Sequence, residues 1–372
     1  MPKIDREHIG VAFDMQGCPN RCRHCWLGSA SNQKLSEQDV RWGVAQFRDF
    51  IHLNTIPINK LSVATWFREP DFSDDYRKLY DLETELGDEK PSRYELLSVW
   101  RLAQDKTYAD WAKSVGPDTC QISFFGMKET NDWFHRRKGV FDDALVATER
   151  LLAVGMKPRW QVFLTTKLLP ELDDLLGLVG QLGLPDRVKK LGGEFQIFIH
   201  LPGPDYEARG IEELRPTVNL LADLPKSILV STRKHFAKEV LWYTEANLHT
   251  KLLAGDDMNN CDNNLPNVLW FLITANWDVF SNAGTLEPWW RLGNLKQDSV
   301  PSIIDKFEND KILGLQILFR KSAKELVGQY GNPEGQKVYS SKGDLLSLYR
   351  GVHCEKVWRE GDNKALELTG GI

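Results

Sequence analysis

Cysteine is scarce in this chain, and long apolar runs are missing. Six cysteines in 372 residues are too few for a disulfide framework, and no secretory signal precedes them. No apolar stretch approaches the roughly 20 residues that span a bilayer, so no membrane partner is expected. Sparse cysteines without an export signal predict a cytoplasmic protein.

An excess of basic residues is also missing. The chain carries 47 Lys and Arg against 52 Asp and Glu, a formal net charge of −5. Nucleic-acid-binding surfaces usually show a strong basic excess, so a nucleic-acid partner is disfavoured. No low-complexity tract or short-period repeat interrupts the sequence. The length suits one large domain, or a domain with an extension.

Three of the six cysteines stand close together near the N-terminus. Cys18, Cys22 and Cys25 have the spacing C-x3-C-x2-C. Three thiolates on one loop can hold three irons of a [4Fe–4S] cluster, which leaves the fourth iron open to bind another molecule. A structural zinc site is the less favoured alternative, because zinc ligand pairs usually come from two separated segments. A four-cysteine ferredoxin pattern fits poorly, since the next cysteine is Cys120.

Apolar strands alternate with amphipathic helices over the first 200 or so residues. The pattern predicts strands over 9–14, 61–66, 95–102, 120–125, 160–165 and 195–200. It predicts helices over 36–53, 71–86, 108–114, 141–154 and 171–182. Repeated β-then-α units predict a parallel sheet with right-handed crossovers, whose functional residues follow the C-terminal ends of the strands.

The cysteine motif and the strand before it resemble the signature of the radical SAM superfamily. The resemblance implies an α/β fold, a partial (β/α)6 TIM-like barrel over residues 1–210, with S-adenosylmethionine (AdoMet) chelated to the open iron. An aromatic residue usually precedes the third cysteine; here His24 offers a flat ring. Glu69-Pro70 is similar to the end of a Gly-Gly-Glu-Pro motif that binds the methionyl amino group, a role that suits a charged acceptor. Alternatively, Glu69 caps the helix that follows.

The resemblance implies cofactor contacts at two further places. Ser123 matches part of a Ser-x-Asp-Gly pattern after the fourth predicted strand, where Phe125 replaces the usual Asp. Arg136 or Arg137 is a candidate for the cofactor carboxylate, since a guanidinium presents planar, bidentate donors. A solvated basic turn is the alternative for both arginines.

Two polar residues at later strand ends are also candidates. Thr165 follows the fifth predicted strand and is placed near the cofactor sugar or the substrate. His200 ends the sixth, beside a loop rich in Gly and Pro that can contact adenine through its backbone. A core histidine with satisfied hydrogen bonds is an equal alternative for His200.

The β/α rhythm weakens after about residue 210. A strand, turn and strand are predicted over 269–280, followed by Leu-Gly-Asn-Leu at 292–295 and a helix over 300–310. This order resembles the SPASM or twitch extensions of radical SAM enzymes and implies an α+β extension over residues 211–372 that closes the barrel mouth. The cysteines that would hold an auxiliary cluster are largely missing, so one cluster is expected.

Cys354 is a candidate hydrogen-atom donor. Some radical SAM epimerases return a hydrogen atom to the substrate from a free thiol, and Cys120 and Cys261 are open to the same interpretation. An inert buried thiol is the alternative, because free cysteines are commonly buried.

The resemblance as a whole implies a radical SAM enzyme that receives an electron from a reductant such as flavodoxin or ferredoxin. AdoMet would be cleaved to methionine and a 5′-deoxyadenosyl radical, which abstracts a hydrogen atom from the substrate. No leader-recognition domain is expected before Ile9, which favours a small polar metabolite or natural product. A peptide-modifying enzyme or an epimerase is the alternative. An RNA-modifying enzyme and a non-catalytic scaffold are less favoured.

Overall fold

The computed structural model describes residues 8–29, 31–53, 59–255 and 265–369. The strands of the first 200 residues are β1 (His8–Phe13), β2 (Lys60–Ala64), β3 (Thr119–Phe124), β4 (Lys157–Phe163) and β5 (Ile197–His200). The helices among them are α1 (Glu37–Leu53), α2 (Tyr76–Leu86), α3 (Val99–Gln104), α4 (Tyr108–Ser114), α5 (Lys128–His135), α6 (Val140–Ala153), α7 (Leu172–Gln181) and α8 (Leu184–Lys190).

The later strands have two to five residues each, and the last helix has 28. The strands are β6 (Tyr243–Thr244), β7 (Leu269–Ile273), β8 (Asp278–Ser281), β9 (Gly293–Asn294) and β10 (Val338–Tyr339). The helices are α9 (Lys226–Phe236), α10 (Glu245–Ala254), α11 (Val300–Glu308), α12 (Leu313–Arg320), α13 (Ala323–Tyr330) and α14 (Lys342–Thr369).

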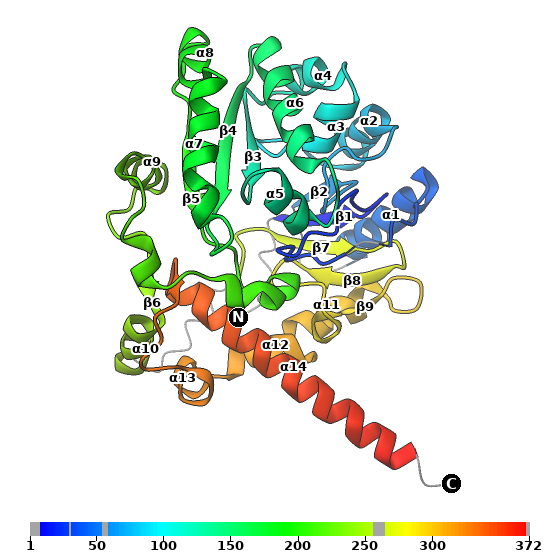
Figure 1. Ribbon diagram of the computed structural model, residues 1–372. Helices are drawn as coiled ribbons and strands as arrows, with labels where there is room; N and C mark the ends of the chain where they lie inside the picture. Colours follow the sequence, from blue (N-terminus) through cyan, green and yellow to red (C-terminus); the bar gives the residue numbers. More distant parts are fainter. Residues whose placement is uncertain (1–7, 30, 54–58, 256–264, 370–372) are drawn as a thin grey trace.

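Parallel strands form the centre of the barrel region. β1 pairs with β2, while β3, β4 and β5 form a second parallel sheet in that order. The two sheets have separate cores, one around Trp160 and one around Phe271. Helices α3, α5 and α6 lie on the outer side of β3 (Figure 1). The predicted fold class, a partial α/β barrel with an α+β extension, is confirmed.

The strand predicted over 95–102 is wrong. Residues 99–104 form helix α3 instead, and its N-cap is Ser98, whose hydroxyl accepts a hydrogen bond of 2.9 Å from the Arg101 amide. Such a cap satisfies an amide that the first helical turn leaves without a partner. The segment before α3 still runs beside β3, since the Glu95 carbonyl accepts a bond of 2.9 Å from the Gln121 amide.

The helix predicted over 71–86 begins later, at Tyr76. Asp71 has a left-handed backbone (φ +53°), and its buried carboxylate accepts hydrogen bonds from Arg93 and from the Tyr108 hydroxyl. Arg93 also pairs with the buried Glu83 on α2, 2.8 Å away. Buried charges need such partners, so residues 67–75 form an anchored loop where a longer helix was expected.

The predicted strand, turn and strand over 269–280 is confirmed as β7 and β8. β7 pairs in parallel with β1, which gives one sheet in the order β2-β1-β7-β8-β9. Gly10 permits the close approach, because a Cβ there would lie 2.2 Å from the Trp270 ring. The extension therefore adds strands to the sheet that carries the cysteine loop, and the domain boundary near residue 210 stays a prediction.

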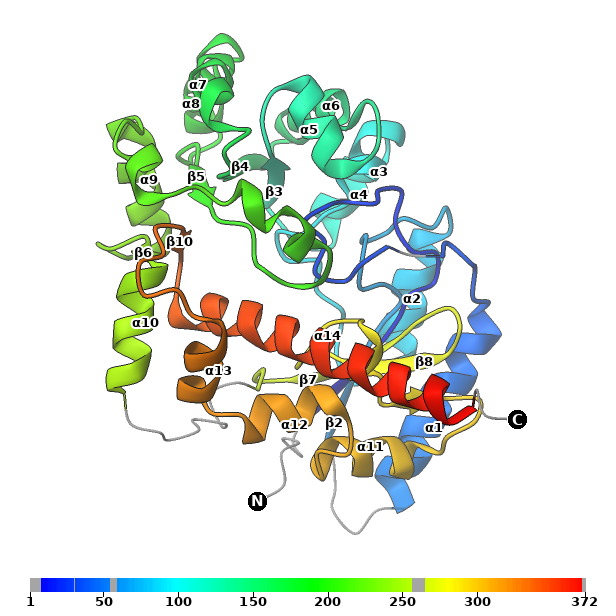
Figure 2. The ribbon, with the colours of Figure 1, turned by 60° about the horizontal axis from the view of Figure 1, so that its bottom comes forward.

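The last helix crosses one side of the molecule. α14 contacts α12 and α13, and its C-terminal part extends beyond them (Figures 1 and 2). In Figure 2 it passes in front of β7 and β8. Closure of the barrel mouth by this extension stays a prediction. Within the described residues, none of the helices combines the length and apolar character that a membrane crossing needs.

Candidate functional site

The three clustered cysteines lie on the loop that follows β1. Two of its amides donate to carbonyls at the end of α5: Arg21 to His135 at 3.2 Å, and Arg23 to Phe134 at 2.8 Å. The last carbonyls of a helix have no partner within it, so they are available to bind this loop. The loop is thereby fixed at the C-terminal ends of the strands, where the β/α pattern places functional residues.

Arg68 fixes the other end of the same loop. Its guanidinium forms a buried ion pair with Asp14 at the end of β1 and donates to the Leu27 and Gly28 carbonyls, each at 3.2 Å. The sequence pattern, in which only Glu69-Pro70 was considered, assigns Arg68 no role. Asp14, directly after the apolar strand β1, was the available signal, because a buried carboxylate there needs a cationic partner such as Arg68.

Burial raises the pKa of the Cys18, Cys22 and Cys25 thiols. Negative neighbours raise the pKa of all three further: Glu69 acts on Cys18, Cys25 on Cys22 and Glu207 on Cys25. Three desolvated thiols in one loop lose their protons readily only when a metal supplies positive charge. The donor set, three sulfurs with no fourth cysteine on the loop, fits a [4Fe–4S] cluster with one open iron.

Glu69 lies directly beside the cysteine loop. One carboxylate oxygen is 4.0 Å from the Cys18 Sγ, and the other accepts a hydrogen bond of 2.5 Å from the Ser98 hydroxyl. Burial raises the pKa of Glu69 to about 7. Glu69 contacts Ser98, the N-cap of α3. It does not cap α2, the next helix in the sequence, which begins at Tyr76 with Asp75 as its N-cap. A cationic group bound near Cys18 would meet an oriented carboxylate here.

Ser123 and His24 occupy different surroundings at the end of β3. The Ser123 hydroxyl is 3.4 Å from the Gln161 side-chain oxygen on β4, so it belongs to a polar row across the two strands. His24 packs into an aromatic cluster, with its ring centroid 4.0 Å from that of Phe125 and 5.4 Å from that of Phe163. Phe125, which replaces the usual Asp, therefore serves as a packing surface for His24.

The two candidate arginines point to different partners. Arg137 donates to the Asn20 side chain on the cysteine loop at 2.6 Å and to Asp143 at 2.7 Å. Arg136 is the C-cap of α5, in a left-handed conformation, and its guanidinium lies 3.4 Å from the Glu207 carboxylate. Arg137 is thus the arginine that contacts the cysteine loop, a distinction that the sequence leaves open.

Thr165 and His200 are placed at the ends of β4 and β5 but face the interior. Thr165 is buried, and its hydroxyl accepts a hydrogen bond of 3.2 Å from the Leu168 amide, which stabilises a turn. The His200 ring lies 5.5 Å from Phe163, and burial lowers its pKa. Its Nδ1 is buried without a hydrogen-bond partner among the described residues.

No known family profile matches this chain, and no curated protein matches it in sequence. Solved structures do resemble it. The histidine-tagged anaerobic sulfatase-maturating enzyme anSMEcpe with bound AdoMet has a TM-score of 0.51 at 14% identity, over 95% of each chain. The chain has the fold of radical SAM enzymes.

Two further structures have lower scores. Native anSMEcpe with AdoMet and the Cp18Cys peptide has a TM-score of 0.49 at 13% identity, over 96% of this chain and 99% of that chain. SuiB of Streptococcus suis bound to S-adenosylmethionine has a TM-score of 0.46 at 14% identity, over 84% of this chain and 68% of that chain.

A cavity of about 370 Å³ adjoins the cysteine loop of this radical SAM fold. Trp26, the residue after the third cysteine, lines it together with Arg209, Glu287 and Cys354. Arg209 and Glu287 form an ion pair within its wall. The volume lies within the roughly 300–1,000 Å³ typical of small-molecule sites.

Cys354 is buried on α14, and burial raises the pKa of its thiol to about 12. The thiol is therefore protonated at neutral pH and keeps its S–H bond. Cys120 lies within β3, fully buried. Cys261 lies outside the described residues.

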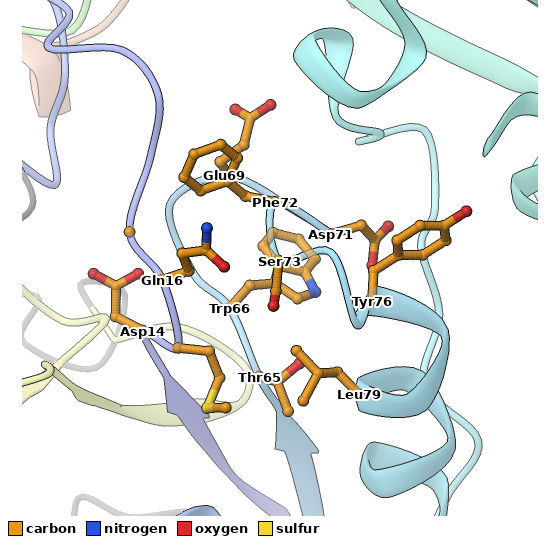
Figure 3. Close-up of a pocket in the computed structure, with 12 residues that line it drawn as sticks. Asp14, Gln16, Thr65, Trp66, Glu69, Asp71, Phe72, Ser73, Tyr76 and Leu79 are labelled. Atoms are coloured by element: carbon orange, nitrogen blue, oxygen red, sulfur yellow. The ribbon is translucent and has the colours of Figure 1, made fainter. Parts of the chain in front are cut away.

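A smaller pocket separates the segments that follow β1 and β2. Figure 3 shows Gln16 on the first segment facing Trp66 and Ser73 on the second. The volume of about 10 Å³ leaves room for roughly one water molecule. Gln16 Oε1 and Trp66 Nε1 are buried there without hydrogen-bond partners among the described residues. This pocket is too small for a cofactor and belongs to the packing of the loop.

Proposed function

We propose that this chain is a radical SAM enzyme in which Cys18, Cys22 and Cys25 hold one [4Fe–4S] cluster. The observation that carries the proposal is the loop itself: three desolvated thiols stand after β1, with the Glu69 carboxylate 4.0 Å from Cys18. When bound, cluster and AdoMet supply a 5′-deoxyadenosyl radical that removes a hydrogen atom from the substrate.

The protein's own residues bind and orient the cofactor. Glu69 accepts hydrogen bonds from the methionyl ammonium group, and Ser98 holds its carboxylate in position. Of Arg136 and Arg137, Arg137 is the candidate for the cofactor carboxylate, because it is the one of the two that contacts the cysteine loop. Ser123 offers a hydroxyl from β3, while His24, on the cysteine loop itself, presents a flat ring that packs on Phe125.

The substrate is a polar small molecule or natural product that enters the cavity beside Trp26. Its walls combine aromatic surface with charged groups, a mixture that suits an orienting site for a polar ligand. A peptide side chain that reaches into the same cavity is the alternative. A flavodoxin or ferredoxin supplies the electron.

Cys354 favours a second candidate, an epimerase. It lines the cavity and keeps its proton at neutral pH, so its S–H bond can donate a hydrogen atom to a substrate radical. The sulfur is left as a thiyl radical, which an external reductant restores to the thiol with one electron and one proton.

The test is anaerobic reconstitution with iron and sulfide, followed by dithionite and AdoMet. We expect 5′-deoxyadenosine and methionine as products. Glu69→Gln should retain cluster iron and form at least about tenfold less product, since it loses a charge-assisted hydrogen bond of roughly 1.5–3 kcal/mol. Glu129→Gln, at an exposed site on α5, is the matched control. A loaded wild-type cluster that yields no 5′-deoxyadenosine with candidate substrates present contradicts the proposal.

A further inference from the structure

A second cavity adjoins the one beside Trp26 and has no part in the proposed reaction. This distal cavity has a volume of about 570 Å³ and lies between helix α14 and two 3₁₀ helices, η2 (Tyr206–Leu214) and η5 (Pro288–Trp290). Arg209 and Glu287 line both cavities, so their ion pair stands in the shared wall. Two cavities that share a wall can hold two parts of one molecule.

Helix α14 relates the two cavities in space. Cys354 lines the cavity beside Trp26, and Trp358 lines the distal cavity. The two residues are four positions apart, so they lie on the same face of the helix, about 6 Å apart along its axis. A molecule that reacts beside Cys354 therefore has its neighbouring group within reach of Trp358.

Two tryptophans form an aromatic wall of the distal cavity. Trp358 is 37% exposed and is backed by Trp289, with ring centroids 6.4 Å apart and planes inclined at 56°. An exposed indole offers a flat apolar face to a ligand ring. Trp289 is only 6% exposed, and its Nε1 is buried without a hydrogen-bond partner among the described residues. A buried N–H without an acceptor is costly, and a ligand oxygen would satisfy it.

Tyr206 lines the distal cavity with a strained backbone. Its φ of +49° lies in the left-handed region, which bulky residues seldom adopt. Its ring packs against the apolar cluster that contains Leu27 and Leu286, and this packing holds the residue in place. Strained positions that the surroundings enforce gather at ligand-binding sites. The conformation of Tyr206 therefore supports a binding role for this wall.

The charges that line the distal cavity nearly cancel. Its carboxylates are those of Glu207, Glu287 and Glu355. Its guanidinium groups are those of Arg209, which pairs with Glu287, and Arg359, which pairs with Glu355. A hydroxyl group both donates and accepts hydrogen bonds, so it can bind to either member of such a pair, whereas a charged ligand is repelled by one of them. The lining therefore favours a neutral, hydroxylated ligand.

The architecture of the distal cavity does not suit a peptide. Its described walls are helix α14 and two 3₁₀ helices, so they offer no strand edge to which a peptide strand can add. The charged lining also differs from the apolar groove that accepts an amphipathic helix. A compact ring fits this lining better than an extended chain does.

We propose that the distal cavity binds a neutral polyhydroxylated ring, a sugar or cyclitol, that forms one part of the substrate. One face of the ring packs on Trp358, and its hydroxyl groups bond to the Trp289 N–H and to the two ion pairs. The reacting part of the same molecule occupies the cavity beside Trp26. The inference rests on the proposed function for the reaction, but ring binding can be measured without the reaction.

The test is saturation-transfer-difference nuclear magnetic resonance on the full-length chain without cluster, AdoMet or reductant. The ring probes are methyl β-glucoside and myo-inositol, and the comparison probes are cadaverine, glutarate and a pentapeptide of Ala and Ser. We expect saturation transfer to the ring C–H protons of both ring probes and weaker transfer to the other three.

Three variants locate the binding. Trp358→Ala should weaken glucoside binding roughly two- to tenfold, the range expected for one lost aromatic contact. Trp289→Phe keeps an aromatic ring but removes the N–H, and it should also weaken binding roughly two- to tenfold. Trp133→Ala removes an equally exposed indole on α5, outside the distal cavity, and should leave binding unchanged. Circular dichroism checks that each variant is folded.

Absence of transfer to both ring probes overturns the proposal, as does glucoside binding that Trp358→Ala and Trp289→Phe both leave unchanged. Tighter binding of cadaverine, glutarate or the pentapeptide at a site sensitive to Trp358→Ala overturns the assigned ligand class. A chain that binds the ring probes but forms no 5′-deoxyadenosine after reconstitution contradicts the proposed function alone. A chain that forms 5′-deoxyadenosine but binds neither ring probe contradicts this inference alone.

Discussion

Single charged residues determine how firmly the cysteine loop is held. Arg68 and Asp14 are only 8% and 6% exposed, so each charge depends on the other for its compensation. The same arginine reaches two carbonyls just after Cys25. The position of the cysteine loop therefore depends on the buried Arg68–Asp14 ion pair, and neither residue belongs to the C-x3-C-x2-C motif.

Replacing Arg68 by Met should destabilise the fold by about 3–5 kcal/mol, because the Asp14 carboxylate would remain buried without a cation. Urea unfolding measures the change, and iron content after reconstitution should fall with it. The double variant Asp14→Asn/Arg68→Met should recover part of the loss. Arg187→Met, which breaks a half-exposed pair with Glu149, is the control and should change stability by about 1 kcal/mol or less. If Arg68→Met and Arg187→Met lowered the free energy of unfolding equally, the proposed dependence of the buried Asp14 charge on Arg68 would be refuted.

Cys354 should resist alkylation in the folded chain. Its folded-state pKa of about 12 lies above the ordinary value of 9.0, so folding favours the protonated thiol. The resulting stabilisation is present below pH 9 and is lost as the pH rises from 9 towards 12. Peptide mapping after iodoacetamide treatment at about pH 9 should show slow modification in native protein and rapid modification in urea. Similar rates in both states would show that the thiol is exposed.

For individual helices and strands, the sequence predictions were correct where no other interaction competed with the local pattern. The predicted helix over 108–114 matches α4, and the hairpin over 269–280 matches β7 and β8. The strand over 95–102 failed because the Ser98 cap and the burial of Leu102 favour a helix. The start of α2 was misplaced because Asp71 is withdrawn into an ion pair with Arg93, a partner 22 residues away. The Ser98 cap spans only three residues and is a local signal that the strand prediction overlooked. The Asp71–Arg93 pair, in contrast, has no signal in a short sequence window.

The pairing of β7 with β1 predicts a strict requirement at Gly10. Gly10→Ala would place a Cβ 2.2 Å from the Trp270 ring, so strand or ring must shift, at a cost of about 1–3 kcal/mol. Gly177→Ala on α7 meets no atom within 4 Å and should stabilise the chain by about 0.5–1 kcal/mol, since Ala favours a helix interior over Gly. Thermal unfolding compares the two. Equal melting temperatures would show that β7 does not pack on β1 as described.

At the scale of the whole molecule, the sequence predicts the chemistry of the site better than its geometry. The C-x3-C-x2-C spacing and Glu69-Pro70 suffice to suggest a cluster and a cofactor. The remaining contacts join residues 54 to 117 positions apart: Arg68 with Asp14, Arg137 with Asn20, and His24 with His135. Such contacts arise only when the strands are brought together, and one sequence without its fold does not contain them.

We propose that Cys18, Cys22 and Cys25 hold a [4Fe–4S] cluster whose open iron binds AdoMet. Electron paramagnetic resonance of the anaerobically reconstituted, dithionite-reduced chain tests this proposal. We predict the signal of a reduced [4Fe–4S] cluster that changes on addition of AdoMet, with the change weakened in Glu69→Gln and no cluster signal in Cys18→Ala/Cys25→Ala. A cluster signal that AdoMet leaves unaltered, or no cluster signal in the wild type, would contradict the claim.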